Sequence, residues 1–183
     1  MTANQDQLLD PSIVISVLAL LFTIFSFWWI HARRGRLQVS PPRSFATLGS
    51  QEAKLVLELP LLFFNTGPQP IVIDNLRLTF LEEKPASPLN FVATLATLGK
   101  DDGREFATQF PVRGREAFVK VCEFQRDPGK LTFEVRQYPM SLEARVNGSK
   151  KWTAILDFDL TVSERGAKII NKNFVVHDNA LES

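Results

Sequence analysis

Two aspartates near the C-terminal end of the chain have the spacing of a catalytic or cation-binding pair. Asp157 and Asp159 lie two residues apart in a run that alternates polar and apolar side chains, so both would point to one face of a strand, with Cα atoms about 7 Å apart. Carboxylates at that separation could share a cation, or act as acid and base in a hydrolase. The other face of the run is apolar, however, so alternation alone explains the pair as the water-facing side of a strand.

The histidines and the cysteine offer no familiar catalytic or metal-binding arrangement. The chain has two histidines, His31 and His177, and one cysteine, Cys122, and their spacing fits no His-x-x-x-His or Cys/His metal motif. A Ser-His-Asp arrangement would need His177 and Asp178, which we expect at a frayed, solvated chain end. No histidine is near Cys122 in sequence to activate its thiol, so we expect a buried structural cysteine.

The remaining acidic and glycine-containing segments are also poor candidates for a cofactor site. Asp101, Asp102 and the pair Glu82-Glu83 have the pattern of solvated loop acids without a third calcium ligand. The glycines of the turns occur singly, and no phosphate-binding glycine loop is present. Lys and Arg number 21 against 20 Asp and Glu, and a net charge of +1 gives no reason to expect nucleic acid as a partner. We therefore expect no enzymatic activity and no cofactor or metal.

The clearest feature of the sequence is an apolar segment without a charged residue. Residues 12–30, SIVISVLALLFTIFSFWWI, would form a helix about 28 Å long, close to the hydrocarbon thickness of a bilayer. A core helix would carry a polar stripe, and a cleaved signal would have a basic start and a shorter apolar run. We therefore predict an uncleaved transmembrane helix in the lipid bilayer. The residues expected at its membrane interface are Trp28, Trp29, His31, Arg33, Arg34 and Arg36.

Basic residues flank this helix on one side only. The short tail, residues 1–11, is acidic and has no Lys or Arg, whereas residues 31–36 form a basic juxtamembrane segment. The positive-inside rule then places the N-terminus outside and the following domain in the cytoplasm. The reverse orientation stays open, because β-sandwich domains on single anchors often lie outside the cytoplasm. Asn147-Gly148-Ser149 matches an N-glycosylation sequon, although the backbone needs of a turn explain it better.

Residues 37–178 have the pattern of a β-domain. Several short runs alternate apolar and polar residues, and Gly, Pro or Asn separates them. We predict an antiparallel two-sheet sandwich of seven to nine strands, immunoglobulin-like or fibronectin-type, and a flexible tail at 179–183. Leu89–Leu98 fits either a short helix or a strand, because helix punctuation flanks a composition that also suits a strand. The other strand runs are Leu55–Leu59, Ile71–Phe80, Phe118–Phe124, Leu131–Val135, Leu142–Val146, Trp152–Val162 and Ile169–Val176.

One hairpin can be given a register from its apolar residues. A two-residue Asn147-Gly148 turn would place Ala144 opposite Lys151, which mixes core and solvent faces. A longer loop instead places Ala144 opposite Trp152 or Ala154, so we predict the longer loop. The inward-facing residues would then be Met140, Leu142, Ala144 and Val146 with Trp152, Ala154, Leu156, Phe158 and Leu160.

The segment Phe64–Leu76, FNTGPQPIVIDNL, resembles a strand-turn-strand pattern that is common in immunoglobulin-like sandwiches of microbial surface and membrane proteins. Its Asn and Gly tolerate the positive φ of a turn, and its Pro restricts the turn. The later segment FPVRGREAF, residues 110–118, is similar to the turn before a late strand of such sandwiches. The resemblance implies a fold and no activity.

Together these features predict a single-pass, non-enzymatic β-domain protein that binds or helps to assemble another membrane or membrane-proximal protein. An extracytoplasmic ligand-binding domain on the same anchor is the main alternative, and a membrane-bound hydrolase is a further one. Loops at the ends of sandwich strands are the usual contact surfaces. The candidate contact residues are Asn65, Gly67, Asp101, Asp102, Asn147 and Gly148.

Overall fold

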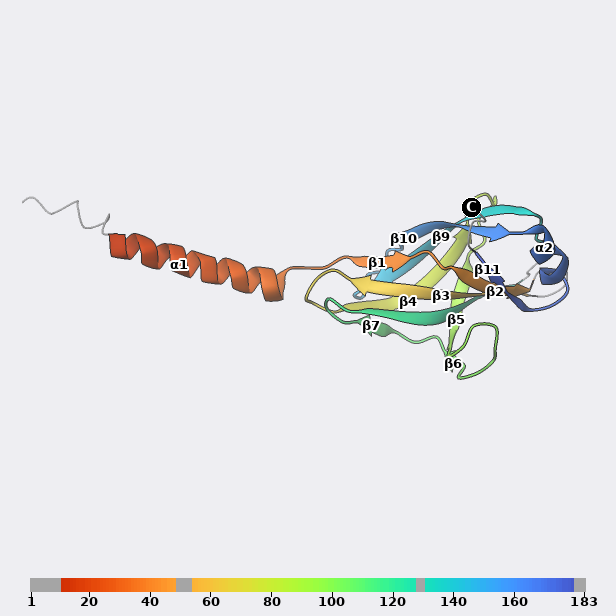
Figure 1. Cartoon of the computed structure of the whole chain (residues 1–183), viewed down its shortest axis with the longest axis horizontal. Helices are drawn as coiled ribbons and strands as arrows, with labels where there is room; N and C mark the ends of the chain where they lie inside the picture. The colour runs from red at the N-terminus through yellow and green to blue at the C-terminus, as the bar shows by residue number, and fades with distance from the viewer. Residues whose placement is uncertain (1–10, 49–53, 128–130, 180–183) are drawn as a thin grey trace, which may run out of the picture.

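The computed structural model describes residues 11–48, 54–127 and 131–179. Its N-terminal part is one helix, α1 (Pro11–Phe27), which continues into a π-helical turn, η2 (Trp28–Ala32). Together they form a helix of 22 residues that is long and apolar enough to cross a membrane, and none of its side chains is buried. Figure 1 shows the helix projecting from the β-domain as a rod. The predicted apolar helix is confirmed, while residues 1–10 of the predicted tail lie outside the described residues.

The rest of the described chain is β-structure with one short helix. Its elements are β1 (Leu37–Ser40), β2 (Ser44–Leu48), β3 (Leu55–Asn65), β4 (Ile71–Phe80), β5 (Leu89–Leu95), β6 (Glu105–Phe106), β7 (Phe110–Val112), β8 (Ala117–Arg126), β9 (Arg136–Val146), β10 (Thr153–Val162), α2 (Glu164–Ile170) and β11 (Val175–Asp178). All strand pairs are antiparallel, in the order β10-β9-β4-β5-β8-β3-β2-β11. Beside this path, β1 pairs with β3, β6 with β5 and β7 with β4.

The sheet curls around a single core because β5 belongs to both of its halves. Leu89 and Asn90 pair with β4, and residues 90–95 pair with β8. Leu89–Leu98, which fitted helix or strand, is therefore a strand as far as Leu95. On the other side β1 comes back into contact with β10, so the sheet forms a half-barrel that is elongated in the direction of the helix (Figure 1).

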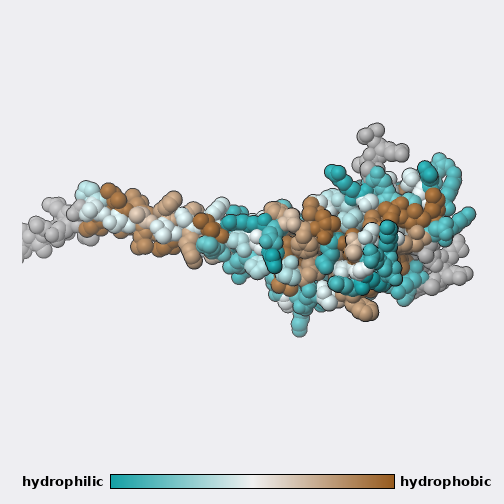
Figure 2. Space-filling model, turned by 60° about the horizontal axis from the view of Figure 1, so that its bottom comes forward, coloured by the Kyte–Doolittle hydropathy of each residue, from teal (hydrophilic) through white to brown (hydrophobic). Residues whose placement is uncertain are grey.

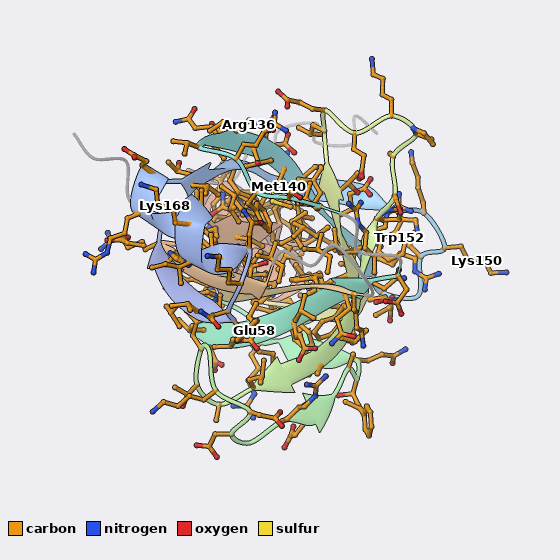
Figure 3. The ribbon with its side chains drawn as sticks, turned by 90° about the vertical axis from the view of Figure 1, so that its right-hand side faces the viewer. Glu58, Arg136, Met140, Lys150, Trp152 and Lys168 are labelled. Atoms are coloured by element: carbon orange, nitrogen blue, oxygen red, sulfur yellow. The ribbon has the colours of Figure 1, made fainter. Side chains whose placement is uncertain are left out.

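Alternating side chains of the long strands fill this half-barrel. In β3, Leu57, Leu59, Leu61 and Phe63 are fully buried, and Met140 of β9 points into the same interior (Figure 3). Burying one such side chain stabilises a fold by roughly 1.5–3 kcal/mol relative to leaving it exposed. The core therefore depends on the same alternation that marks these strands in the sequence.

An antiparallel β-domain is confirmed, but the predicted two-sheet sandwich of seven to nine strands is not. The described residues form eleven strands, and β5 keeps the two halves of the sheet continuous. Four strands, β1, β6, β7 and β11, have only two to four residues, too few for alternation to mark them reliably. An immunoglobulin-like or fibronectin-type arrangement is likewise not confirmed, although Phe64–Leu76 does hold a strand end, a turn and a strand start.

One predicted strand run has another structure, and a second, Ile169–Val176, is a strand only at Val175 and Val176, in β11. Residues 131–135 are irregular: Phe133 packs in the core, and the Asn171 side chain binds the backbone N–H and carbonyl of Phe133. Residues 169 and 170 of the second run end helix α2, which is capped at its start by Ser163 Oγ accepting from Gly166 N at 3.1 Å. Short apolar runs fit a buried loop, a helix face or a strand equally well.

The β9–β10 hairpin has the predicted longer loop but a different register beside it. Ala144 pairs with Thr153 rather than with Trp152 or Ala154, and Ala154 is exposed. The register shifts after Ala154, where a β-bulge adds one residue that alternation alone cannot locate. Beyond the shift the apolar pairs are Leu142 with Leu156, Met140 with Phe158 and Tyr138 with Leu160.

Candidate functional site

Three loops of the β-domain lie at the end where the helix meets it. They follow β3 (residues 66–70), β7 (113–116) and β9 (147–152), and antiparallel pairing brings them to one end of the half-barrel (Figure 1). The basic segment 33–36 enters at the same end, before β1. The fold thus gathers Asn65, Gly67, Asn147 and Gly148 with the juxtamembrane arginines, while Asp101 and Asp102 lie apart on the β5–β6 loop.

Asn65 holds the β3–β4 loop from inside the domain. Its side chain is fully buried, and its Nδ2 donates to the carbonyls of Gln69 at 2.7 Å and Val112 at 3.2 Å. Its Oδ1 accepts from Gly67 N at 3.0 Å. Buried polar groups that are fully hydrogen-bonded in this way fix a local conformation. Asn65 therefore positions the loop and has no exposed surface to offer a partner.

The linker after the helix is hydrogen-bonded to the same loop. Arg36 N donates to Thr66 Oγ1 at 2.8 Å, and Thr66 N donates to the Arg36 carbonyl at 3.1 Å. Gly35 and Gly67 meet backbone to backbone. A Cβ on Gly35 would lie 2.6 Å from Gly67 Cα, and closer still to Gly67 N and Asn65 Oδ1. Glycine permits this approach because it has no Cβ.

A third contact reaches the helix itself from the β7–β8 loop. Arg115 Nη2 donates to the Ile30 carbonyl at 3.1 Å. Carbonyls at a helix C-terminus lack intrahelical partners, and a cation there also interacts favourably with the helix dipole. Arg115 has a φ of 58°, and its N–H donates to the Gly67 carbonyl at 2.9 Å, so the loop aims this side chain at the helix. We name the contacts of residues 30–36 with the β3–β4 and β7–β8 loops the joint.

The predicted membrane-interface residues surround the joint. All six are exposed. The Arg33 guanidinium lies 4.4 Å from the centroid of the Trp29 ring, in a cation–π contact. The His31 ring lies against Phe27, with ring centroids 5.0 Å apart. Indole and guanidinium groups at this position are suited to contact lipid headgroups.

Asn147 fixes the third loop, between β9 and β10. It has a φ of 52°, its Oδ1 accepts from Val72 N at 2.9 Å, and its N–H donates to the Val72 carbonyl at 2.9 Å. Gly148 N donates to Asp74 Oδ2 at 2.6 Å. The Asn-Gly pair thus has a structural role as a turn, and Lys150, which follows it, extends away from the domain (Figure 3).

A cleft of about 550 Å³ opens between the linker and the β9–β10 loop. Its lining includes Arg34, Gln69, Pro70 and Asn147. The arginine can bind an anion there, whereas the lining contains no nucleophile with an adjacent base.

A second site contains two carboxylates that are buried side by side. Glu58 and Glu123 pair directly across β3 and β8, and they are only 4% and 1% exposed. The β5–β6 loop reaches both: Gly99 N donates to Glu58 Oε2 at 2.8 Å, and Arg104 Nη2 donates to Glu123 Oε1 at 2.8 Å. Burial raises the pKa of both carboxyl groups, and these donors only partly offset that effect. Glu58 lies on the wall of the half-barrel that this loop covers (Figure 3).

Sequence reasoning did not find this acidic pair. The alternation of β3 and β8 predicts that both glutamates face water, and it is the β5–β6 loop that buries them. Within the covering loop, Arg104 also contacts an acidic residue three positions earlier: its Nη1 lies 3.6 Å from Asp101 Oδ1. The arrangement ties the β5–β6 loop, which includes the predicted contact residue Asp101, to the sheet.

The aspartates with catalytic spacing lie where alternation places them. Asp157 and Asp159 are both exposed on β10. Asp157 Oδ1 accepts from Ser141 Oγ of the neighbouring strand at 2.6 Å. A hydroxyl–carboxylate pair across two strands stabilises the sheet and needs no catalytic role.

His177 lies in an ordered strand, which corrects the expectation of a frayed end. It pairs with Phe45 of β2, and the two rings are 5.6 Å apart. Partial burial lowers the pKa of His177. The chain is also held just beyond β11, because Asn179 Nδ2 donates to the carbonyls of Pro42 and Asp159 at 3.0 Å each. Residues 180–183 of the predicted tail lie outside the described residues.

Cys122 is fully buried in β8, and burial raises the pKa of its thiol to about 12. Such a thiol is not nucleophilic at neutral pH. Within the described ranges, no group of three or more His, Cys, Asp or Glu side chains could hold a metal ion. Comparisons of the chain with protein-family models, with curated proteins and with solved structures found no match.

Proposed function

We propose that α1 anchors this chain in a membrane as a single span, and that the β-domain binds or helps to assemble another protein there without catalysis of its own. The joint is the observation that carries the proposal. A long flexible linker is enough for a domain that only has to stay near a membrane. A helix end that is capped by Arg115 and a linker that is bonded to Thr66 instead hold the domain in one orientation. A fixed orientation is useful to a protein that presents a defined surface.

The surface presented beside the joint is an apolar groove. Leu62 and Phe64 on the outer side of β3 are 36% and 37% exposed, and Val119, which pairs with Leu62, is 64% exposed. Contiguous exposed apolar surface is typical of protein contact sites. Figure 2 shows brown surface on the β-domain close to the helix, separated from it by teal surface. Residues lining the groove, of about 550 Å³, include Leu37, Leu62, Phe64, Ala117 and Ile155.

The orientation that we propose has the N-terminus outside and the β-domain in the cytoplasm. Arg33, Arg34 and Arg36 on the domain side of the helix support it. Alkaline phosphatase fused after Ser183 tests it, because this enzyme needs disulfides and is active only outside the cytoplasm. An active fusion would contradict this orientation and favour the extracytoplasmic ligand-binding alternative.

Photo-crosslinking in intact membranes tests the binding role. A photoreactive residue at position 119 of the full chain should give a defined adduct with a membrane or membrane-proximal protein. Val119 borders the groove, because it pairs with the lining residue Leu62. The matched control is position 135, because Val135 is similarly exposed, at 57%, but neither lines the groove nor pairs with a residue that does. No adduct at 119, or the same adducts at 119 and 135, would contradict a binding surface at the groove.

A further inference from the structure

Positive charge is concentrated at the end of the β-domain that meets the helix. We define the basic end as residues 31–36, 66–70, 112–116 and 146–152. These segments contain seven Lys or Arg and one Glu, a net charge of +6, whereas the whole chain, with 21 Lys or Arg and 20 Asp or Glu, carries +1. The remainder of the chain is therefore net acidic.

The cations of the basic end have no carboxylate partner among the described residues, so their charge is available to an external anion. All seven are exposed, and the ion pairs found within the described residues involve none of them. Elsewhere on the domain, exposed cations such as Arg136 and Lys168 do have carboxylate partners. The seven cations are Arg33, Arg34, Arg36, Arg113, Arg115, Lys150 and Lys151.

The joint fixes the depth of the basic end relative to the helix. Arg115 bonds the carbonyl of Ile30, the residue after Trp29, and Trp29 belongs at headgroup level. Even fully extended, the linker 33–36 spans at most about 14 Å. Charges act over about 8 Å at physiological salt, so Arg115 and the linker arginines beside Ile30 stay within reach of charged headgroups. The β9–β10 loop lines the same cleft as Arg34 through Asn147, which keeps its lysines at this end of the domain.

We propose that the basic end is a docking surface for anionic phospholipid headgroups, and that it holds the β-domain down on the leaflet from which the helix emerges. The fold assembles this surface from segments that are far apart in the chain, so it extends beyond the juxtamembrane arginines alone. Guanidinium groups bind phosphate through paired hydrogen bonds, and the cleft beside Arg34 provides room for a headgroup. The proposal rests on the membrane anchoring proposed above.

The test uses the full chain in vesicles of phosphatidylcholine with or without phosphatidylglycerol. Ser149→Cys in the β9–β10 loop carries a donor dye, and a headgroup-labelled lipid is the acceptor. The buried Cys122 does not compete for the dye, and a membrane-impermeant maleimide labels only domains that face outward. Short donor lifetimes then report docked domains, and long lifetimes report undocked ones.

We expect phosphatidylglycerol to raise the ratio of docked to undocked domains and high salt to lower it. Lys150→Glu combined with Lys151→Glu should lower the ratio in phosphatidylglycerol vesicles at least about twentyfold, since each cation near an anionic surface contributes about fivefold. The matched control, Lys168→Glu with Lys172→Glu, makes the same charge change at the opposite end of the domain, where Lys168 lies on α2 (Figure 3), and should leave the ratio unchanged.

Carbonate extraction separates the two proposals. A chain that carbonate removes from the vesicles would overturn both the anchoring and the docking. If the chain is inserted but its ratio of docked to undocked domains does not change with phosphatidylglycerol or salt, the docking alone is overturned. Equal effects of the two double variants would also overturn it, because the effect would then come from net charge and not from the basic end.

Discussion

Replacing Gly35 with alanine tests whether the joint is a fixed contact. The new Cβ would lie 2.6 Å from Gly67 Cα and closer to Gly67 N, and neither is the movable end of a side chain. The backbone of Gly35 is not in the left-handed region, so alanine adds steric overlap without φ strain. Relieving an overlap of this kind costs about 1–3 kcal/mol. We take about 2 kcal/mol as the expected loss.

The overlap can be relieved in two ways, which two measurements distinguish. If the β3–β4 loop shifts within the folded domain, thermal unfolding of the full chain in detergent should show a Tm about 4–8 °C lower. If the linker instead separates from the loop, the Tm stays near its wild-type value. The amides of Arg36 and Thr66, which form the joint's hydrogen bonds, should then exchange with deuterium about thirtyfold faster.

Gly148→Ala is the control for this substitution. Gly148 has a φ of +74°, and a Cβ there would meet nothing within 4 Å, so alanine costs only backbone strain of about 1–2 kcal/mol. Exchange at Arg36 and Thr66 should not change. A Gly35→Ala chain with wild-type Tm and wild-type exchange at both amides would refute the account of the joint.

Three further predictions concern titratable groups whose pKa is shifted by full or partial burial. Glu58→Gln should stabilise the domain at neutral pH by about 1 kcal/mol. Burial raises the pKa of Glu58, so the wild-type carboxyl becomes protonated, and less costly to bury, as pH falls toward 4.5. The difference in free energy of unfolding between the variant and the wild type, measured with urea, should therefore shrink over that range; a difference that does not change with pH would contradict this account. Burial lowers the pKa of His177, so wild-type stability should fall as pH drops through 6.5, and His177→Phe should weaken that dependence. Cys122 should react with a maleimide only after unfolding; rapid reaction of the native chain would contradict its burial.

The long elements were predictable because each repeats one simple pattern. Residues 12–30 have no charge, and strands such as Leu55–Asn65 alternate over many residues. The strand β6, with two residues, carries no such pattern, and Ile169-Ile170 suits a helix as well as a strand. Strand count and sheet division depend on these weak elements, which explains why the β-domain prediction was confirmed and the specific sandwich was not.

The site residues were only partly predictable, because their roles depend on contacts between distant segments. Asn65 was expected as a contact residue from its turn sequence, yet its side chain faces inward to bond Val112. Arg115 carried no signal, since its partner, the Ile30 carbonyl, lies 85 positions earlier in the chain. The Glu58–Glu123 pair became visible only once strand register and the covering loop were known.

The joint also constrains how a partner can reach the apolar groove. The half-barrel is elongated in the direction of the helix, and β1 lies on its side, close to the end that meets the helix (Figure 1). Residues of β1 line the groove together with Leu62 and Phe64. A domain that is also held down by its basic end presents Leu62 and Phe64 sideways, parallel to the membrane surface. A partner that already lies in or on the same membrane can approach from that direction without losing further freedom of orientation. We therefore expect the protein captured at position 119, once identified from its adduct, to sediment with the membrane in cells that were not irradiated; a captured protein found in the soluble fraction of those cells would contradict this geometry.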